Sequence, residues 1–119
     1  MNSYLSDNEY NELVDVAEGH PLRSLMRYSA PDDAPADFSF DDRREIFFWA
    51  LTRLLKEGRL RLAKHGRFLE GTIEEQVELF REALPRTEAE LDDGIWFFDE
   101  ECPAGAVWVD PDDGSLYWT

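Results

Sequence analysis

Cysteine and histidine are scarce in this sequence, and their scarcity excludes several kinds of site. Cys102 is the only cysteine, and His20 and His65 are the only histidines. A single cysteine cannot form an internal disulfide, which fits a reducing compartment. Zinc sites need several cysteine or histidine ligands at close spacing, and that spacing does not occur here. We therefore expect no disulfide framework, no metal centre and no cofactor.

Basic residues are also few, and long apolar runs are missing. The chain has 27 Asp and Glu against 12 Lys and Arg, a net charge of -15. This charge disfavours nucleic acid and anionic membranes as partners. The longest apolar run, 46–51, is far too short to span a membrane, and the first residues lack the pattern of a signal peptide. These features predict a soluble, cytoplasmic protein.

What the chain does contain is typical of one folded domain. Its 119 residues are 43% hydrophobic and 13% aromatic, which is enough for a core. We expect a single domain, 1–119. Residues 1–40 would form amino-terminal helices and a loop rich in proline and aspartate, and residues 41–119 would form the rest of the core.

Helical periodicity predicts about four helices. Ser6 with Glu9, and Thr72 with Glu75, have the spacing of capping boxes. Pro21 is suited to open a short second helix. The third helix is apolar over more than half its circumference and should be the central one. The expected helices begin near Ser6, Pro21, Asp41 and Thr72.

Alternating and aromatic segments predict the strands. Residues 59–63 alternate charged and apolar side chains, and 64–68 should turn back to complete a hairpin. Residues 94–98, 105–109 and 115–119 are short, aromatic and separated by turn formers. They predict a carboxy-terminal three-stranded antiparallel meander. The expected fold is α+β, with mostly amino-terminal helices packed on a small antiparallel sheet.

Cys102 is the first candidate for chemistry. Asp99, Glu100 and Glu101 precede it, and nearby negative charge raises the pKa of a thiol and suppresses the thiolate that a nucleophile needs. We interpret Cys102 as a structural residue of a turn. With 27 acidic residues, spacing alone cannot single out a catalytic carboxylate pair. We therefore expect no enzyme activity, and an enzyme that uses Cys102 or two carboxylates is the rival hypothesis.

The segment 110–119 resembles a calcium-binding loop but departs from its pattern. Counted from Asp110, the fifth position is Gly114, and no glutamate follows at the twelfth. Asp112, Asp113 and Gly114 better fit a hairpin turn. A weak divalent-ion site among these carboxylates is an alternative.

Charge is distributed unevenly along the chain. Residues 70–119 carry 15 acids and two bases, whereas 41–69 carry eight bases and four acids. We interpret the bases as a solvated sheet face paired with the acidic half, rather than as a phosphate site. The acidic half, rich in aromatics, is typical of a surface that captures a basic protein. The hypothesised contact residues are Asp92, Asp93, Trp96, Asp99, Glu100, Glu101, Trp108, Asp110, Asp112 and Asp113.

Three stretches of the chain are distinctive as strings: "FLEGTIEEQVELFREALP", "GIWFF" and "CPAGAVW". They resemble a bacterial family known as domain of unknown function 596, over about residues 41–119. The resemblance implies a small acidic α+β protein with no established enzyme activity. It also implies, for some members, a location beside toxin genes and a suspected immunity role. It supplies no functional residues.

These observations together predict a binding protein. The leading hypothesis is an immunity protein that neutralises a cognate, basic bacterial toxin domain by covering its active site. The partner would be a protein and not nucleic acid or membrane. Besides the enzyme, a further alternative is a regulatory module that forms homo-oligomers through a spare aromatic face, with Trp96 or Trp118 at the contact.

Overall fold

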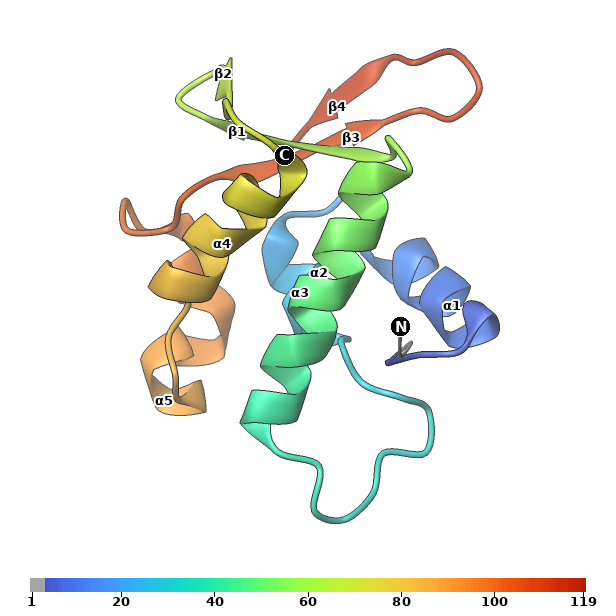
Figure 1. Cartoon of the computed structure of the whole chain (residues 1–119), viewed down its shortest axis with the longest axis vertical. Helices are drawn as coiled ribbons and strands as arrows, with labels where there is room; N and C mark the ends of the chain where they lie inside the picture. The colour runs from blue at the N-terminus through green and yellow to red at the C-terminus, as the bar shows by residue number, and fades with distance from the viewer. Residues whose placement is uncertain (1–3) are drawn as a thin grey trace.

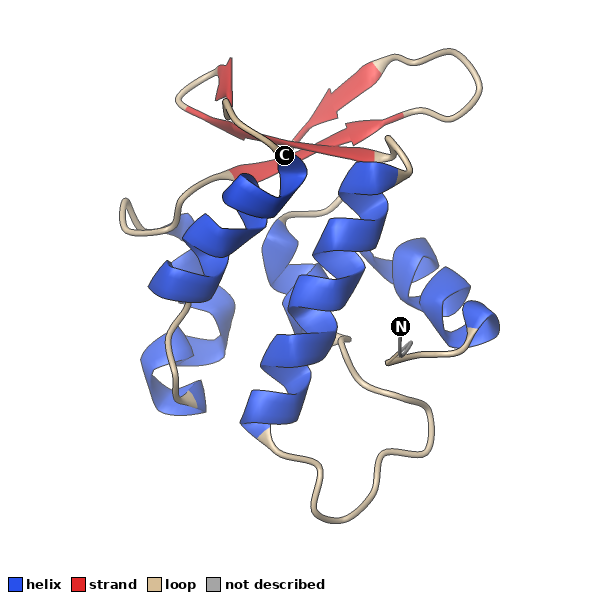
Figure 2. Cartoon of the chain, in the orientation of Figure 1, coloured by secondary structure: helices blue, strands red, loops and turns tan. Residues whose placement is uncertain are grey.

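Helices form one layer of this protein and a four-stranded sheet forms the other (Figures 1 and 2). The computed structural model describes residues 4–119, so the first three residues of the predicted domain 1–119 lie outside the description. The helices are α1 (Asp7–Ala17), α2 (Leu22–Arg27), α3 (Phe40–Lys56), α4 (Ile73–Ala83), α5 (Glu88–Leu91) and the 3₁₀ helix η1 (Asp92–Phe98). The strands are β1 (Leu60–Lys64), β2 (Arg67–Phe68), β3 (Gly105–Val109) and β4 (Leu116–Trp118). The predicted α+β class is confirmed.

Complete capping boxes start three of the helices. The side chains of Ser6 and Thr72 accept hydrogen bonds from the backbone N–H groups of Glu9 and Glu75, whose carboxylates bond back to the cap. Both boxes were predicted. The third box, at Ser39, was not predicted, because it uses an aspartate where the motif usually has Glu or Gln. The short helix α2 follows Pro21, as predicted.

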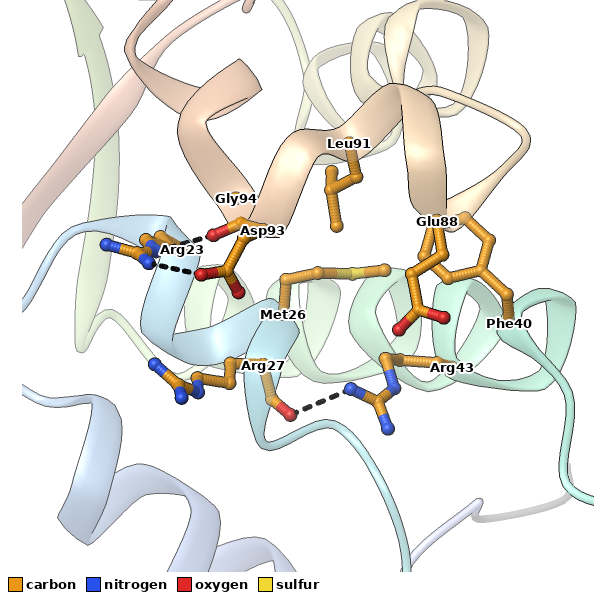
Figure 3. Close-up of a pocket in the computed structure, with 9 residues that line it drawn as sticks. All are labelled: Arg23, Met26, Arg27, Phe40, Arg43, Glu88, Leu91, Asp93 and Gly94. Carbon is orange, nitrogen blue, oxygen red and sulfur yellow. Dashed lines mark hydrogen bonds and ion pairs between the residues drawn. The ribbon is translucent and has the colours of Figure 1, made fainter.

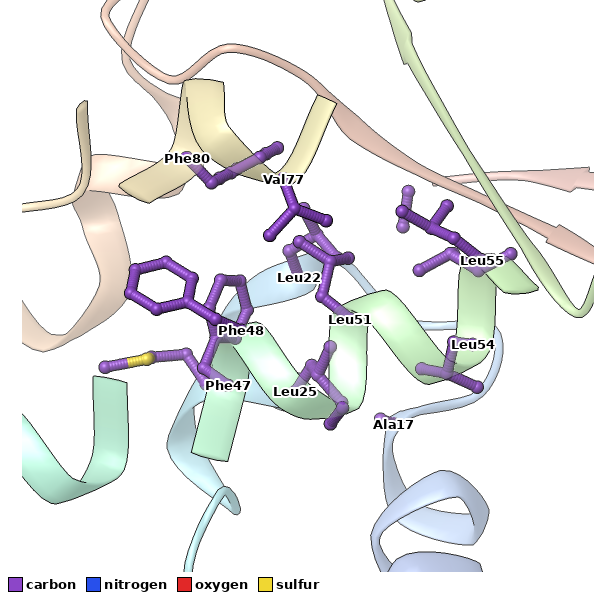
Figure 4. Packing of buried hydrophobic residues seen from close by; sticks show 14 of the residues in the cluster. Ala17, Leu22, Leu25, Phe47, Phe48, Leu51, Leu54, Leu55, Val77 and Phe80 are labelled. Atoms are coloured by element: carbon purple, nitrogen blue, oxygen red, sulfur yellow. The ribbon is translucent and has the colours of Figure 1, made fainter. Parts of the chain in front are cut away.

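Helix α3 is the centre of the main core (Figure 4). Phe47, Leu51 and Leu54 on this helix are fully buried. Leu25 of α2 and Phe80 of α4 pack around them, so α3 is enclosed on several sides, as its apolar circumference predicted. Burial of this kind contributes about 25 cal/mol per Å² of apolar surface. No helix among residues 4–119 has the length and apolar character that a membrane span requires.

The sheet has the strand order β2-β1-β3-β4, and every neighbouring pair is antiparallel. The predicted hairpin of β1 and β2 is confirmed. His65 and Gly66 form its two-residue turn with φ of 54° and 78°, the positive values that a type I′ turn requires. The turn predicted at Asp112 and Asp113 joins β3 to β4.

The predicted carboxy-terminal meander is wrong in its first strand. Residues 94–98 belong to η1, so only β3 and β4 are strands in this part of the chain. The backbone is left-handed at Asp92, Asp93 and Gly94, where η1 begins. Within η1, Ile95 and Phe98 are exposed while the two residues between them are buried. A spacing of three residues is the period of a 3₁₀ helix and not of a strand.

Candidate protein-binding surface

The ten predicted contact residues do not lie on one surface. Asp92 and Asp93 lie where α5 meets η1, 99–101 lie in the loop before β3, and 110–113 lie in the turn after β3. Strand β3 separates the last two groups. Its five residues span roughly 16 Å at the usual rise of an extended chain. Figure 1 shows these two loops at opposite ends of the strand.

Two of the predicted carboxylates have partners within the molecule. Asp93 lies 3.2 Å from a guanidinium nitrogen of Arg23, whose Nε also donates to the Asp93 carbonyl at 2.8 Å (Figure 3). Glu100 lies 2.8 Å from Nε2 of His65. The hydrogen bond with His65 lowers the pKa of Glu100. These carboxylates position loops of the chain itself, which reduces what they offer to a partner.

The two predicted tryptophan anchors are buried, and this part of the prediction is wrong. Trp96 is 5% exposed and packs edge-on against Phe97. Trp108 is 2% exposed, and its indole N–H donates to the His20 carbonyl at 2.8 Å. Trp108 points to the helix side of the sheet, where it belongs to the main core. Neither ring is available to anchor a partner.

The exposed aromatic residues lie on β4 instead. Leu116, Tyr117 and Trp118 are 43%, 61% and 48% exposed. The sequence analysis predicted a strand in this segment, but it named Trp118 only as a contact between copies of the chain and not as a contact with a toxin. A strand of three apolar residues directly after an acidic turn was the available signal. The sequence alone could not predict that this strand lies at the edge of the sheet, because its position depends on which strands pair with it.

A small second cluster lies on the outer face of the sheet, away from the helices. Val107 and Ala63 are buried there but are not part of the main core. The rings of Phe68 and Trp118 stack beside them with their centres 5.3 Å apart. The Arg61 guanidinium lies 3.5 Å from the centre of the Phe68 ring. Figure 2 shows every helix on the opposite side, so no helix covers this face.

Three carboxylates stand next to the exposed strand. Asp110, Asp112 and Asp113 are exposed, and none forms an ion pair with residues 4–119. Asp110 accepts a hydrogen bond from the backbone N–H of Asp112 at 2.8 Å, and Asp113 accepts one from Ser115 at 2.9 Å. The bond from Ser115 lowers the pKa of Asp113. The turn therefore holds uncompensated negative charge beside Leu116 and Tyr117.

A groove runs between this turn and the end of α1. Glu18 and Gly19 form one wall, and residues 108–111 and 115–117 form the other. Its volume is 260 Å³. Tyr117 and Trp108, which are paired across β3 and β4, both line it. We call Asp110, Asp112, Asp113 and β4 the hairpin surface.

The remaining candidates have structural roles. Burial, more than the neighbouring acids, raises the pKa of Cys102 to about 11, and its thiol contacts the Ala104 carbonyl. The raised pKa confirms the prediction, although its main cause differs. The interpretation of the basic residues is borne out in part: Lys56 and Lys64 pair with Glu74 and Glu100 of the acidic half, whereas Arg59 pairs with Glu18, which lies outside it. No group of three potential metal ligands converges among residues 4–119.

Comparison with known proteins supports the family assignment. The family model described as "Protein of unknown function, DUF596" matches residues 55–119. This chain belongs to that family. A solved structure of an uncharacterised protein conserved in bacteria, from Neisseria meningitidis, is 36% identical, with a TM-score of 0.75. The match covers 93% of this chain and 87% of that one. No curated protein matches the chain.

The residues that the family model matches show which elements this chain shares with other DUF596 proteins. The family region begins at the end of α3 and includes the whole sheet, α4, α5 and η1. The hairpin surface therefore lies inside it. The similarity to the Neisseria protein covers 93% of this chain and so extends beyond the family region. Neither comparison describes an activity, so the function has to be argued from the surface itself.

Proposed function

We propose that this protein is an immunity protein that binds a basic toxin domain and covers its active site. The observation that carries the proposal is the hairpin surface, where three carboxylates without an ion pair to residues 4–119 adjoin a strand of exposed apolar side chains. Interfaces of high affinity combine buried aromatic anchors with charged rims that steer association. The hairpin surface has both parts on one projecting element.

The overall charge supports the same partner chemistry. A net charge of -15 attracts a basic protein over distances of about 10 Å at moderate salt. Toxin domains that cleave nucleic acid need basic surfaces to bind phosphate. An acidic surface that is already folded can occupy such a site without a large ordering cost. We propose that this binding takes place in the cytoplasm and involves no chemical reaction.

The exposed strand also favours a second candidate function. Apolar residues on an unpaired sheet edge can bind a second copy of the same chain. A self-associating regulatory module would use Leu116 and Trp118 in the same way. The carboxylates distinguish the two functions, because they attract a basic partner and repel a second acidic copy.

Co-expression tests the proposed function directly. The product of the gene adjacent to this one would be expressed in bacteria with and without this protein, and growth would be followed. We expect growth arrest that this protein relieves, and a complex that co-purifies. Toxicity that this protein cannot relieve, or no toxicity at all, would contradict the proposal.

Matched charge variants then locate the contact. One variant neutralises the hairpin surface and the other neutralises exposed acids elsewhere, each by three charges: Asp110→Asn, Asp112→Asn and Asp113→Asn in the first, Asp92→Asn, Asp99→Asn and Glu101→Gln in the second. The asparagines retain the acceptor oxygens of the turn. We expect the first variant to associate about tenfold more slowly, with a weaker salt dependence, and the second to change far less. Equal effects would show that only net charge matters.

A further inference from the structure

Strand β4 has one edge without a partner strand. It is the last strand in the order β2-β1-β3-β4, so β3 binds only one of its sides. In antiparallel strands, successive residues direct their backbone N–H and C=O groups to opposite sides. Asp110 donates to Ser115, and Thr119 donates to Ala106. The residues that bond to β3 are therefore the odd-numbered ones, including Tyr117.

It follows that Leu116 and Trp118 direct their backbone groups away from the sheet. The pairing on the other side of β3 agrees, since Val109 donates to Arg59 beside β1. The register therefore leaves the N–H groups of Leu116 and Trp118 without a strand partner within residues 4–119. Two donors and two acceptors therefore line the free edge in the spacing that another strand recognises.

We propose that β4 binds its partner by strand addition, with an extended, basic segment of the partner as the fifth strand of the sheet. This inference rests on the proposed function, because it describes how the toxin domain would be held. Backbone hydrogen bonds to Leu116 and Trp118 would provide affinity, and the side chains on the two faces would provide specificity.

The two faces of the strand favour different side chains in the partner. On the outer face, Trp118 and Phe68 offer an aromatic surface that fits apolar residues. On the helix side, Tyr117 lines the groove that also contains Asp110. Because side chains of an added strand alternate between the faces, the fitting segment alternates apolar and basic residues. The acidic turn at 110–113 lies at one end of the edge and would pair with further bases.

A second copy of this chain fits the edge less well. Each copy carries a net charge of -15 and the same three carboxylates in its hairpin turn. Antiparallel pairing of β4 with β4 would place the two turns at opposite ends of the new strand pair, so the repulsion comes from the net charge of the two copies. Charge complementarity therefore selects a basic occupant over a self-complementary one.

Proline substitution at Leu116 tests the edge itself. Leu116→Pro removes the outward N–H and is tolerated on an edge strand, because β3 does not use that donor. Leu116→Ala removes the same apolar contact but keeps the N–H. Affinity for the product of the adjacent gene would be measured by calorimetry for both variants. We expect Leu116→Pro to bind at least about fivefold more weakly than Leu116→Ala. Equal affinities would overturn strand addition and leave the immunity function standing.

A synthetic strand tests the edge without the toxin. The probe is an eight-residue peptide of alternating lysine and valine, and its control carries an N-methyl group on every residue, which removes the donors along both edges. Amide hydrogen exchange would be measured by nuclear magnetic resonance. We expect the probe to slow exchange at Leu116 and Trp118, and the control to have no effect. Failure of the probe to protect these amides would refute the inference, whatever the adjacent gene product does.

Analytical ultracentrifugation tests the remaining alternative, in which a second copy of this chain binds the edge of β4. If the chain alone formed dimers at micromolar concentration that Leu116→Pro abolished, the edge would belong to a second copy and a basic occupant would be wrong. We expect a monomer for the wild type and for both Leu116 variants at physiological salt.

Discussion

The hydrogen bond between Tyr10 and Glu57 should stabilise this fold in a way that depends on pH. The Tyr10 hydroxyl donates to Oε1 of Glu57 at 2.7 Å, and Arg53 donates to Oε2 at 3.0 Å. The Arg53 guanidinium also lies 3.8 Å from the centre of the Tyr10 ring. These contacts connect α1 to the end of α3. Tyr10→Phe removes one hydrogen bond and keeps the buried ring.

The size of the effect follows from the exposure of Glu57. A hydrogen bond to a charged group contributes about 1.5–3 kcal/mol to stability. The Glu57 side chain is 36% exposed, so water can replace part of the lost bond. We therefore expect Tyr10→Phe to lower the free energy of unfolding at pH 7 by about 1.5 kcal/mol. For a domain of this size, that corresponds to a melting temperature about 6 °C lower.

The pH dependence gives the prediction its sharper test. Burial alone would raise the pKa of Glu57, but hydrogen bonds from Tyr10 and Arg53 outweigh it and lower the pKa below its ordinary value. A carboxylate with a lowered pKa stabilises the fold above its ordinary pKa, and this stability is lost as the pH falls through the folded-state pKa. The difference between wild type and Tyr10→Phe should thus be largest near neutral pH and shrink below about pH 4.

Urea unfolding followed by tryptophan fluorescence measures both quantities. Wild type, Tyr10→Phe, Glu57→Gln and the double variant would be compared at pH 7 and pH 3.5. We expect Tyr10→Phe to cost much less in the Glu57→Gln background, because the charged acceptor is already gone. A cost that is the same in both backgrounds, or the same at both pH values, would refute the reasoning.

Three further predictions concern stability and reactivity. Native Cys102 should react with iodoacetamide at pH 8 about 100-fold more slowly than in urea, because burial raises the pKa of its thiol to about 11, and equal rates would contradict the structure. Arg44 is 6% exposed, and its Nε has no hydrogen-bond partner among residues 4–119. Arg44→Met should therefore leave the melting temperature unchanged or raise it. A loss of more than about 1 kcal/mol in the free energy of unfolding would show that the Arg44 guanidinium has a stabilising partner. Gly94→Ala should destabilise by about 2 kcal/mol or more in urea unfolding, because its φ is 86° and a Cβ would meet Cγ of Arg23 at 2.4 Å. The control is Gly114→Ala, where φ is 74° and an added Cβ meets open space, so it should cost only about 1 kcal/mol. Equal losses for the two variants would show that the clash with Arg23 does not contribute to the cost at Gly94.

The elements predicted correctly are those whose signals are local. Capping boxes at Ser6 and Thr72 act within four residues, and His65 with Gly66 meets the backbone demands of a tight hairpin turn by itself. The apolar circumference of α3 likewise predicted its central position. Local sequence was sufficient here because the preferences of these segments agree with the fold that contains them.

The error at 94–98 shows where local signals fail. Its aromatic residues favour a strand, but Arg23, 70 positions away in the chain, bonds to the Asp93 backbone and packs against Gly94. This contact accompanies the left-handed turn that starts η1. β-propensity is weak compared with such tertiary contacts, because it mainly reflects the packing of neighbouring side chains.

The candidate surface depended on tertiary structure more than the fold class did. The sequence by itself determined the acidity of the chain, the segments of its main helices and the acidic turn before β4. It could not determine which tryptophans are buried, because burial depends on which sheet face the helices cover. The pairing of β3 with β1 placed Trp108 inside and left β4 at the edge with Trp118 exposed. Only the folded chain decides this, since side chains alternate between faces and pairing alone determines which strand has a free edge.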